Sequence, residues 1–287
     1  MKARNTAYQS LLSEFNTRLL ALDYARQLYE PTTAHRFTTF NWIDLEENRL
    51  SRILAYFLNP AGGHGQGRLF LETFVSMVNS HIQRDVRLNN YNQVVVETEA
   101  VTANLDANNR IDILVTLRSQ AGISFGIGIE NKIWAHDQPK QLESYVTELE
   151  TRFGPDNYLL IYLTPFEREM VEHTIASAKR KALEGTALIA LTYDEHFVAK
   201  TARSNRLFAQ WMHYCQAERV RWFLKDINDY FLQHILQESA MADTEELVKL
   251  IKERNNLAPA LAELFFAAKP AVEQLVYGKV KQFAESF

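Results

Sequence analysis

Residues 110–132 read RIDILVTLRSQAGISFGIGIENK, and this stretch decides the fold that the rest of the chain must accommodate. Two runs rich in Ile, Val and Leu flank the polar turn at residues 119–122, which predicts a β-hairpin. A turn centred near Ala121 pairs Ile113 with Ile129 and places their side chains on one apolar face.

The other face of this hairpin has a different chemistry. There Asp112 lies opposite Glu130, and Lys132 follows on the same side. Like charges placed opposite each other destabilise a sheet unless a cation joins them, and carboxylate oxygens suit Mg²⁺ or Mn²⁺. Gly126 and Gly128 on this face are interpreted as room for a substrate. The alternative is an ordinary surface pair of Lys132 with one of the acids.

These residues resemble a known motif. Asp112 followed by Glu130-Asn131-Lys132 is similar to the pattern of the PD-(D/E)XK nuclease superfamily, with Ile111 in place of the usual proline. The resemblance implies an α/β, restriction-endonuclease-like αβββαβ core with a mixed central sheet. It also implies Mg²⁺-dependent hydrolysis of phosphodiester bonds, with Mn²⁺ as a substitute. Asp112, Glu130 and the carbonyl of Asn131 would bind the metal, and Lys132 would be catalytic.

A helix predicted over residues 44–58 supplies a further acid. Glu47 and Ser51 share one face of that helix. A helical carboxylate is usually solvated or pairs with the helix dipole, but the resemblance implies that Glu47 is catalytic and joins the metal ligands. Glu46 is the competing residue, and periodicity does not separate the two.

Gln141 and Tyr145 lie one helical turn apart directly after the Glu-Asn-Lys strand. Asp137 is expected to cap their helix. The pair resembles the Gln-x-x-x-Tyr motif of exonuclease-like members of the superfamily, which implies that Gln141 and Tyr145 bind the substrate.

Two further candidates come from loops and strand ends. His64 lies in the glycine-rich loop AGGHGQG at residues 61–67, which either only turns the chain or brings His64 to a phosphate as a substrate-binding residue. The strand predicted at residues 93–100 puts Glu97 and Glu99 on the face of Asp112. We expect Glu99 to lie beside the metal, with solvent exposure as the alternative.

The remaining pattern divides the chain into three parts. We predict an N-terminal helix and connector at 1–40, a nuclease-like core at 41–200 and a helical C-terminal region packed on it at 201–287. Further strands are expected at 157–163 and 187–192, and helices at 6–28, 68–82, 206–236, 244–268 and 270–285. The aromatic stripe of 206–236 is interpreted as core or dimer surface.

Composition limits the class of protein. The 287 residues are 47% hydrophobic, and the formal net charge of −4 argues against a general coat of nucleic-acid-binding charge, while a local basic groove stays open. The single cysteine excludes a disulfide framework, and we expect a cytoplasmic protein without a membrane span. We expect nucleic acid as the partner, with DNA in preference to RNA. We also expect that the chain can form a homo-oligomer through its C-terminal helices. The alternatives are a catalytically idle nuclease-fold binding or regulatory protein and a helical assembly partner.

Overall fold

The computed structural model describes residues 37–236 except 44, 103–109, 123 and 194–206, together with scattered positions between 13 and 34. The chain forms two compact units, Phe37–Leu236 and a second that combines Met1–Arg36 with Gln237–Phe287. Described positions of the second unit are mostly helical, and there Arg18 pairs with Glu14 at 3.0 Å. The helices predicted at 244–268 and 270–285 lie outside the described residues, as does much of the one at 6–28.

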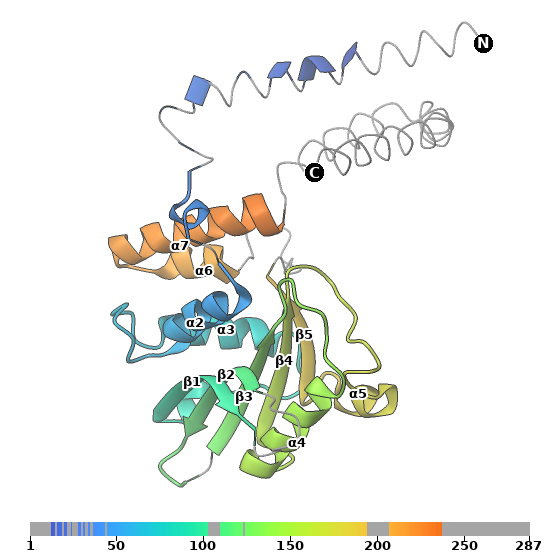
Figure 1. The fold of residues 1–287 in the computed structure, drawn as a ribbon. Helices are drawn as coiled ribbons and strands as arrows, with labels where there is room; N and C mark the ends of the chain where they lie inside the picture. The colour runs from blue at the N-terminus through green and yellow to red at the C-terminus, as the bar shows by residue number, and fades with distance from the viewer. Residues whose placement is uncertain are drawn as a thin grey trace, which may run out of the picture. The chain divides into compact units, whose positions relative to one another are not determined.

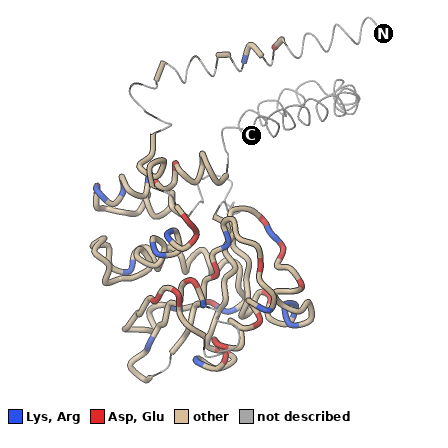
Figure 2. The backbone as a smooth tube through the Cα atoms, in the orientation of Figure 1, with Lys and Arg blue, Asp and Glu red and all other residues tan. Residues whose placement is uncertain are grey.

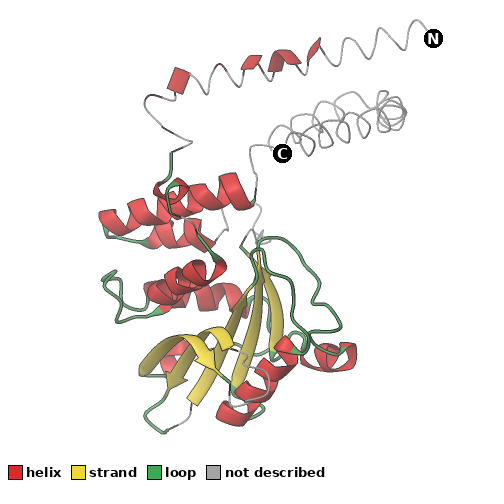
Figure 3. Ribbon diagram, viewed as in Figure 1, coloured by secondary structure: helices red, strands yellow, loops and turns green. Residues whose placement is uncertain are grey.

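The first unit is built on a five-stranded mixed sheet with the strand order β1-β2-β3-β4-β5 (Figures 1 and 3). Strands β1 to β3 are antiparallel neighbours, whereas β3, β4 and β5 run parallel. The predicted restriction-endonuclease-like α/β class is therefore confirmed. The strands are β1 (Gln93–Val101), β2 (Arg110–Arg118), β3 (Ser124–Asn131), β4 (Tyr158–Thr164) and β5 (Leu188–Thr192).

Helices cover both faces of this sheet (Figure 1). Those packed on the face that carries Ile113 are α2 (Glu47–Leu58), α3 (Leu69–Asn79), α6 (Leu207–Tyr214) and α7 (Glu218–Tyr230). The opposite face carries α4 (Gln141–Phe153), while α5 (Ser177–Leu183) precedes β5. Shorter turns are η1 (Thr39–Asn41), η2 (Leu88–Asn90) and η3 (Phe231–Ile235), the last with π-helical hydrogen bonds.

The hairpin has the register that the sequence predicts. Ile113 pairs with Ile129, and Leu114 pairs with Gly128. The register follows from side-chain alternation, because a slip of one residue would turn every apolar side chain of the hairpin away from the helices that cover it. Asp112 and Glu130 come directly after the last of these pairs, at the open end of the hairpin.

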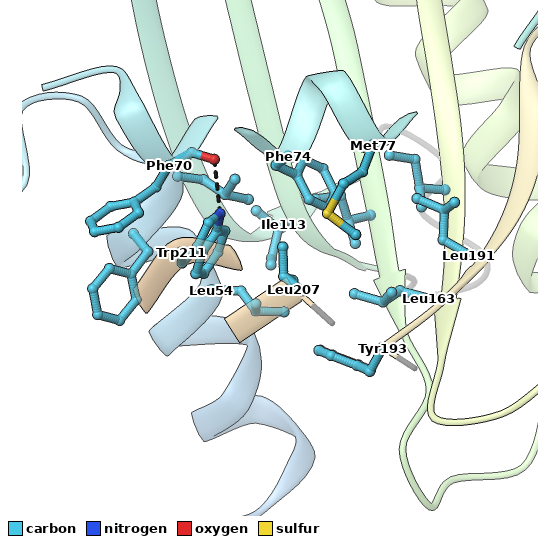
Figure 4. Close-up of a cluster of buried hydrophobic side chains, with 14 of the residues drawn as sticks. Leu54, Phe70, Phe74, Met77, Ile113, Leu163, Leu191, Tyr193, Leu207 and Trp211 are labelled. Atoms are coloured by element: carbon cyan, nitrogen blue, oxygen red, sulfur yellow. Dashed lines mark hydrogen bonds between the residues drawn. The ribbon is translucent and has the colours of Figure 1, made fainter. Parts of the chain in front are cut away.

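The larger core lies between the sheet and helices α2, α3, α6 and α7. Trp211 is fully buried there, and its indole Nε1–H donates to the carbonyl of Phe70 at 3.0 Å (Figure 4). Phe208 and Phe231 are buried in the same core, whereas Trp222 is 62% exposed. Most of the aromatic stripe is therefore core, as one of the two interpretations had it.

The two glycines of β3 make room for a helix, so their interpretation as an approach for substrate is wrong. A Cβ added to Gly126 would lie 2.2 Å from Cε2 of Phe153, and one added to Gly128 would lie 3.0 Å from Cδ1 of Leu149. Both side chains belong to α4. The missing side chains thus let α4 pack closely against β3.

We expect Gly126→Ala to reduce the free energy of unfolding by about 1–3 kcal/mol, the usual cost of overpacking a filled core. Urea denaturation measures the change. The matched control is the same substitution in a Phe153→Ala background, where the obstructing ring is absent. An equal loss in both backgrounds would show that the ring of Phe153 is not the obstacle.

Membrane insertion receives no support from the helices that the structure describes. Each of them is too short or too polar to span a bilayer.

Candidate active site

Two carboxylates and a lysine meet where β2 and β3 end. The Asp112 Oδ2 atom accepts the backbone N–H of Asn131 at 2.8 Å, which ties the two strands together beyond their last pair. The Nζ atom of Lys132 lies 2.9 Å from Oε1 of Glu130, and both side chains are at most 5% exposed. Asp112, Glu130 and Lys132 therefore lie together as predicted. The pair of Lys132 with Glu130 is buried and is not a solvated surface pair.

The carboxylate of Glu130 is held on one oxygen and left unpaired on the other. Its Oε1 also accepts Nε2–H of Gln141 at 2.8 Å. The same amide nitrogen donates to the hydroxyl of Tyr145 at 3.0 Å, and that hydroxyl donates to the carbonyl of Arg110 at 2.6 Å. The Oε2 atom of Glu130 is buried and has no hydrogen-bond partner among the described residues. A buried carboxylate oxygen in this condition is costly unless a ligand satisfies it.

The electrostatics of the pair reflect this burial. Burial raises the pKa of Asp112 to about 7, although the Asn131 N–H opposes the rise, and the negative charge of Glu47 adds to it. Burial and the charge of Asp112 raise the pKa of Glu130 to about 8 and outweigh the attraction of Lys132. Burial opposes the ammonium of Lys132, but its acidic neighbours, Glu130 first, raise its pKa overall. The lysine therefore stays charged beside two acids whose joint ionisation is disfavoured.

The middle residue of Glu-Asn-Lys points to the opposite face of β3. The amide Nδ2 of Asn131 donates to the hydroxyl of Ser51 on α2 at 3.1 Å. Its Oδ1 accepts the hydroxyl of Tyr193, which follows β5, at 2.8 Å. All three side chains are buried. Asn131 thus connects β3 with α2 and with the far edge of the sheet.

Glu47 faces this centre, and Glu46 does not. Glu46 is exposed and makes no capping hydrogen bond, whereas Oε2 of Glu47 accepts three successive backbone N–H groups after Lys132. These belong to Ile133, Trp134 and Ala135, at 3.0, 3.1 and 3.2 Å. Among the residues that the structure describes, no three acidic, His or Cys side chains form a group able to hold a metal ion. Through its three hydrogen bonds, Glu47 holds the turn that follows β3 and Lys132.

The predicted N-cap at Asp137 is wrong, because the helix begins later and Asp137 has another role. Helix α4 starts at Gln141, after Lys140 in a left-handed conformation with φ of 58°. Asp137 instead accepts the hydroxyl of Tyr162 at 2.9 Å and lies 3.4 Å from Nη2 of Arg168. Tyr162 pairs with Glu130 across the sheet, so this second cluster adjoins the first.

His64 is used inside its own loop. Its Nδ1 accepts the N–H of Gln66 at 3.1 Å, so Nε2 carries the proton, which it donates to the carbonyl of Asn59 at 2.9 Å. The ring is buried and packs against Phe57 and Phe70. Neither ring nitrogen is left to contact a substrate, and none of these contacts reaches Asp112.

The acids of β1 are separated by their surroundings. Glu99 adopts a positive φ of 56°, contributes to the raised pKa of Asp112 and lies 3.6 Å from Nη1 of Arg110. Glu97 is exposed and pairs with Leu114. Of the two acids, Glu99 is the one whose charge acts on the centre.

Comparison with known proteins agrees with this geometry. The sequence profile described as the PD-(D/E)XK nuclease superfamily matches residues 37–250. The chain belongs to the PD-(D/E)XK nuclease superfamily. No match was found among curated proteins or among solved structures.

Members of this superfamily are generally hydrolytic nucleases, which indicates nucleic acid as the partner. In this chain, acidic and basic positions alternate along the described backbone instead of gathering in one basic region (Figure 2).

The sequence patterns did not identify three residues that come from distant segments of the chain and hydrogen-bond or pair with residues around the site. Tyr162, Arg168 and Tyr193 come long after the Glu-Asn-Lys strand and belong to no motif. One signal was available, because a parallel strand next to β3 must place a residue beside Glu130, and Tyr162 is a polar aromatic that follows three consecutive aliphatic residues in that strand.

We expect Glu47→Ala to lower the free energy of unfolding by about 1–3 kcal/mol, because three N–H groups lose their shared acceptor. Chemical denaturation gives the value. Glu46→Ala is the matched control, with an expected loss below about 1 kcal/mol, since only its interaction with the helix dipole is removed. Equal losses in the two variants would contradict the anchoring role of Glu47.

The carboxylate pair should also make stability depend on pH. Because the folded pKa values of Asp112 and Glu130 are raised to about 7 and about 8, the folded chain keeps protons that the unfolded chain releases above pH about 4. In EDTA, stability is therefore expected to fall as pH rises from about 4 to about 8. Thermal melts of wild type and Asp112→Asn across this range test the point. A slope that is no shallower in the variant would contradict it.

Proposed function

We propose that this chain is a Mg²⁺-dependent nuclease that hydrolyses phosphodiester bonds, with DNA in preference to RNA. The observation that carries the proposal is the unpaired, buried Oε2 of Glu130 beside Asp112 and the Lys132 ammonium. Two acids that repel each other and one unsatisfied oxygen are the donor set that a hard divalent cation satisfies.

The residues present fit such a cation. Asp112 and Glu130 would hold it, with the carbonyl oxygen of Asn131 as a third oxygen donor. When bound there, the ion supplies polarisation of a phosphate oxygen and a lowered pKa of a coordinated water. We assign Glu47 to the turn after Lys132 in place of the metal shell, because its Oε2 already accepts three N–H groups.

Lys132 contributes a fixed positive charge. Its ammonium is buried, is held 2.9 Å from Glu130 and keeps its proton because its pKa is raised. The ammonium of Lys132 orients the attacking water and stabilises the negative charge that develops on the phosphate. Its ion pair with Glu130 also sets its position before any substrate arrives.

Gln141 and Tyr145 act on the chemistry through Glu130. Nε2 of Gln141 donates to both Oε1 of Glu130 and the Tyr145 hydroxyl, and that hydroxyl donates to the carbonyl of Arg110, so the carboxylate is held at Oε1 and Oε2 is left available. Both side chains are buried, at 6% and 1% exposure, so we assign them to positioning and not to direct substrate contact.

Incubation with linear DNA, circular DNA and RNA tests the activity, each with Mg²⁺, with Mn²⁺ and with EDTA. We expect cleavage of DNA that requires the divalent ion. Cleavage in EDTA would contradict the metal dependence. Failure to cut any of the three, together with metal-dependent stabilisation, would favour the idle nuclease-fold binding protein.

We expect Lys132→Ala to cut about 10²-fold more slowly, the cost of removing one oriented group that stabilises the transition state. Mn²⁺ should still raise the melting temperature of this variant, because both carboxylates remain. The control is Lys181→Ala, which removes an exposed lysine from α5 and should cut at the wild-type rate. Wild-type cleavage by Lys132→Ala would remove the lysine from the mechanism.

A further inference from the structure

The turn that follows Lys132 carries an exposed tryptophan on a backbone that is held from two sides. Trp134 is 50% exposed, and its backbone N–H donates to Oε2 of Glu47 at 3.1 Å. The carbonyl of the next residue, Ala135, accepts Nη1–H of Arg168 at 3.1 Å. Glu47 of helix α2 and Arg168 after β4 both hydrogen-bond to this turn, so the backbone that carries the indole is fixed in place.

This tryptophan lies close to the proposed chemistry. It follows Lys132 by two residues, so their Cα atoms are at most about 7.6 Å apart, twice the spacing of consecutive Cα atoms. The ammonium of Lys132 in turn contacts Glu130. A phosphodiester bound at Lys132 would therefore have its neighbouring nucleotides close to the turn that carries Trp134.

The indole is half exposed and has no specific partner in the described part of the chain. Within the described residues, no ring contact, ion pair or hydrogen bond involves the side chain of Trp134. Half-exposed tryptophan leaves a large flat apolar surface in water, and such surfaces stack well on nucleobases. A base inside an intact duplex has both faces covered by its neighbours, whereas a single strand or a frayed end offers a base face without the cost of unstacking a pair.

We propose that Trp134 stacks on the base next to the phosphate that is cut, which makes single-stranded or frayed nucleic acid the preferred substrate. This inference rests on the proposed nuclease function, because that function places the phosphate beside Lys132. It adds the form of nucleic acid and the residue that selects it. Trp134 contacts the base, while Lys132 and the cation that Asp112 and Glu130 would hold lie at the phosphate.

A tryptophan-reporter variant of the full chain tests the contact. Trp42→Phe and Trp222→Phe remove two tryptophans that are 83% and 62% exposed, which leaves Trp134 and the buried Trp211 as fluorophores. The variant is titrated in EDTA at low salt, where cleavage does not occur, with three probes. These are a single-stranded oligothymidylate, an abasic oligomer of the same length and a blunt duplex.

We expect the oligothymidylate to quench the fluorescence, and the abasic oligomer, which has the same phosphates without bases, to leave it nearly unchanged. Trp134→Ala should weaken binding of the oligothymidylate by about tenfold, within the range of one base stacked on an aromatic ring. Binding of the abasic oligomer should not change. Trp134→Phe keeps an aromatic face and should retain most of the affinity, while Trp42→Ala is the matched control that should retain all of it.

Several outcomes would overturn the inference. These are equal quenching by the two oligomers, no binding of the oligothymidylate, tighter binding of the duplex, or a Trp134 that acrylamide does not reach in the free protein. Should Trp134→Ala not fold, Trp134→Phe and the quenching titration still decide. If the chain cuts DNA but Trp134→Ala binds normally, only this inference fails. If base-dependent binding is present without cleavage, the nuclease proposal fails and the stacking contact stands.

Discussion

The structure depends on the burial of two neighbouring carboxylates at the open end of a hairpin. Burial is the largest cause that raises the pKa of Asp112 and Glu130 above their ordinary values, and the charge of Asp112 further disfavours ionisation of Glu130. Three groups partly offset this unfavourable burial: the Lys132 ammonium and the Gln141 amide at Glu130, and the backbone N–H of Asn131 at Asp112. Such a concentration of unfavourable terms is typical of sites built for a ligand or a reaction.

The elements around this pair are arranged to keep its geometry constant. Asn131 joins β3 to α2 through Ser51, and Glu47 holds the turn after Lys132. Helix α4 approaches β3 closely because Gly126 and Gly128 have no side chains, and this approach brings Gln141 to Glu130. The apolar layers thus do more than stabilise the unit, because they fix the positions of the polar groups at the end of the sheet.

Sequence reasoning succeeded where local rules decide the structure. Alternation fixed the pairing of Ile113 with Ile129 and so placed Asp112 and Glu130 together, and helical spacing placed Gln141 above Tyr145. It failed where partners come from distant segments. The glycines of β3 looked like open space because nothing local indicates that Phe153 fills it, and Asp137 looked like a cap because Tyr162 and Arg168 lie beyond α4. Side-chain contacts between remote loops carry no period that a sequence pattern can reveal.

The position of the acids at the open end of the β2–β3 hairpin determines where the chain tolerates a change of length. The two strands are joined by a short turn around Gly122, and every pair between that turn and the acids is in register. A residue added within either strand would move one carboxylate to the other face of the sheet. Residues added at the turn would leave both acids where they are. The turn at residues 119–122 is therefore a suitable place to insert a label or an affinity tag, whereas the two strands are not.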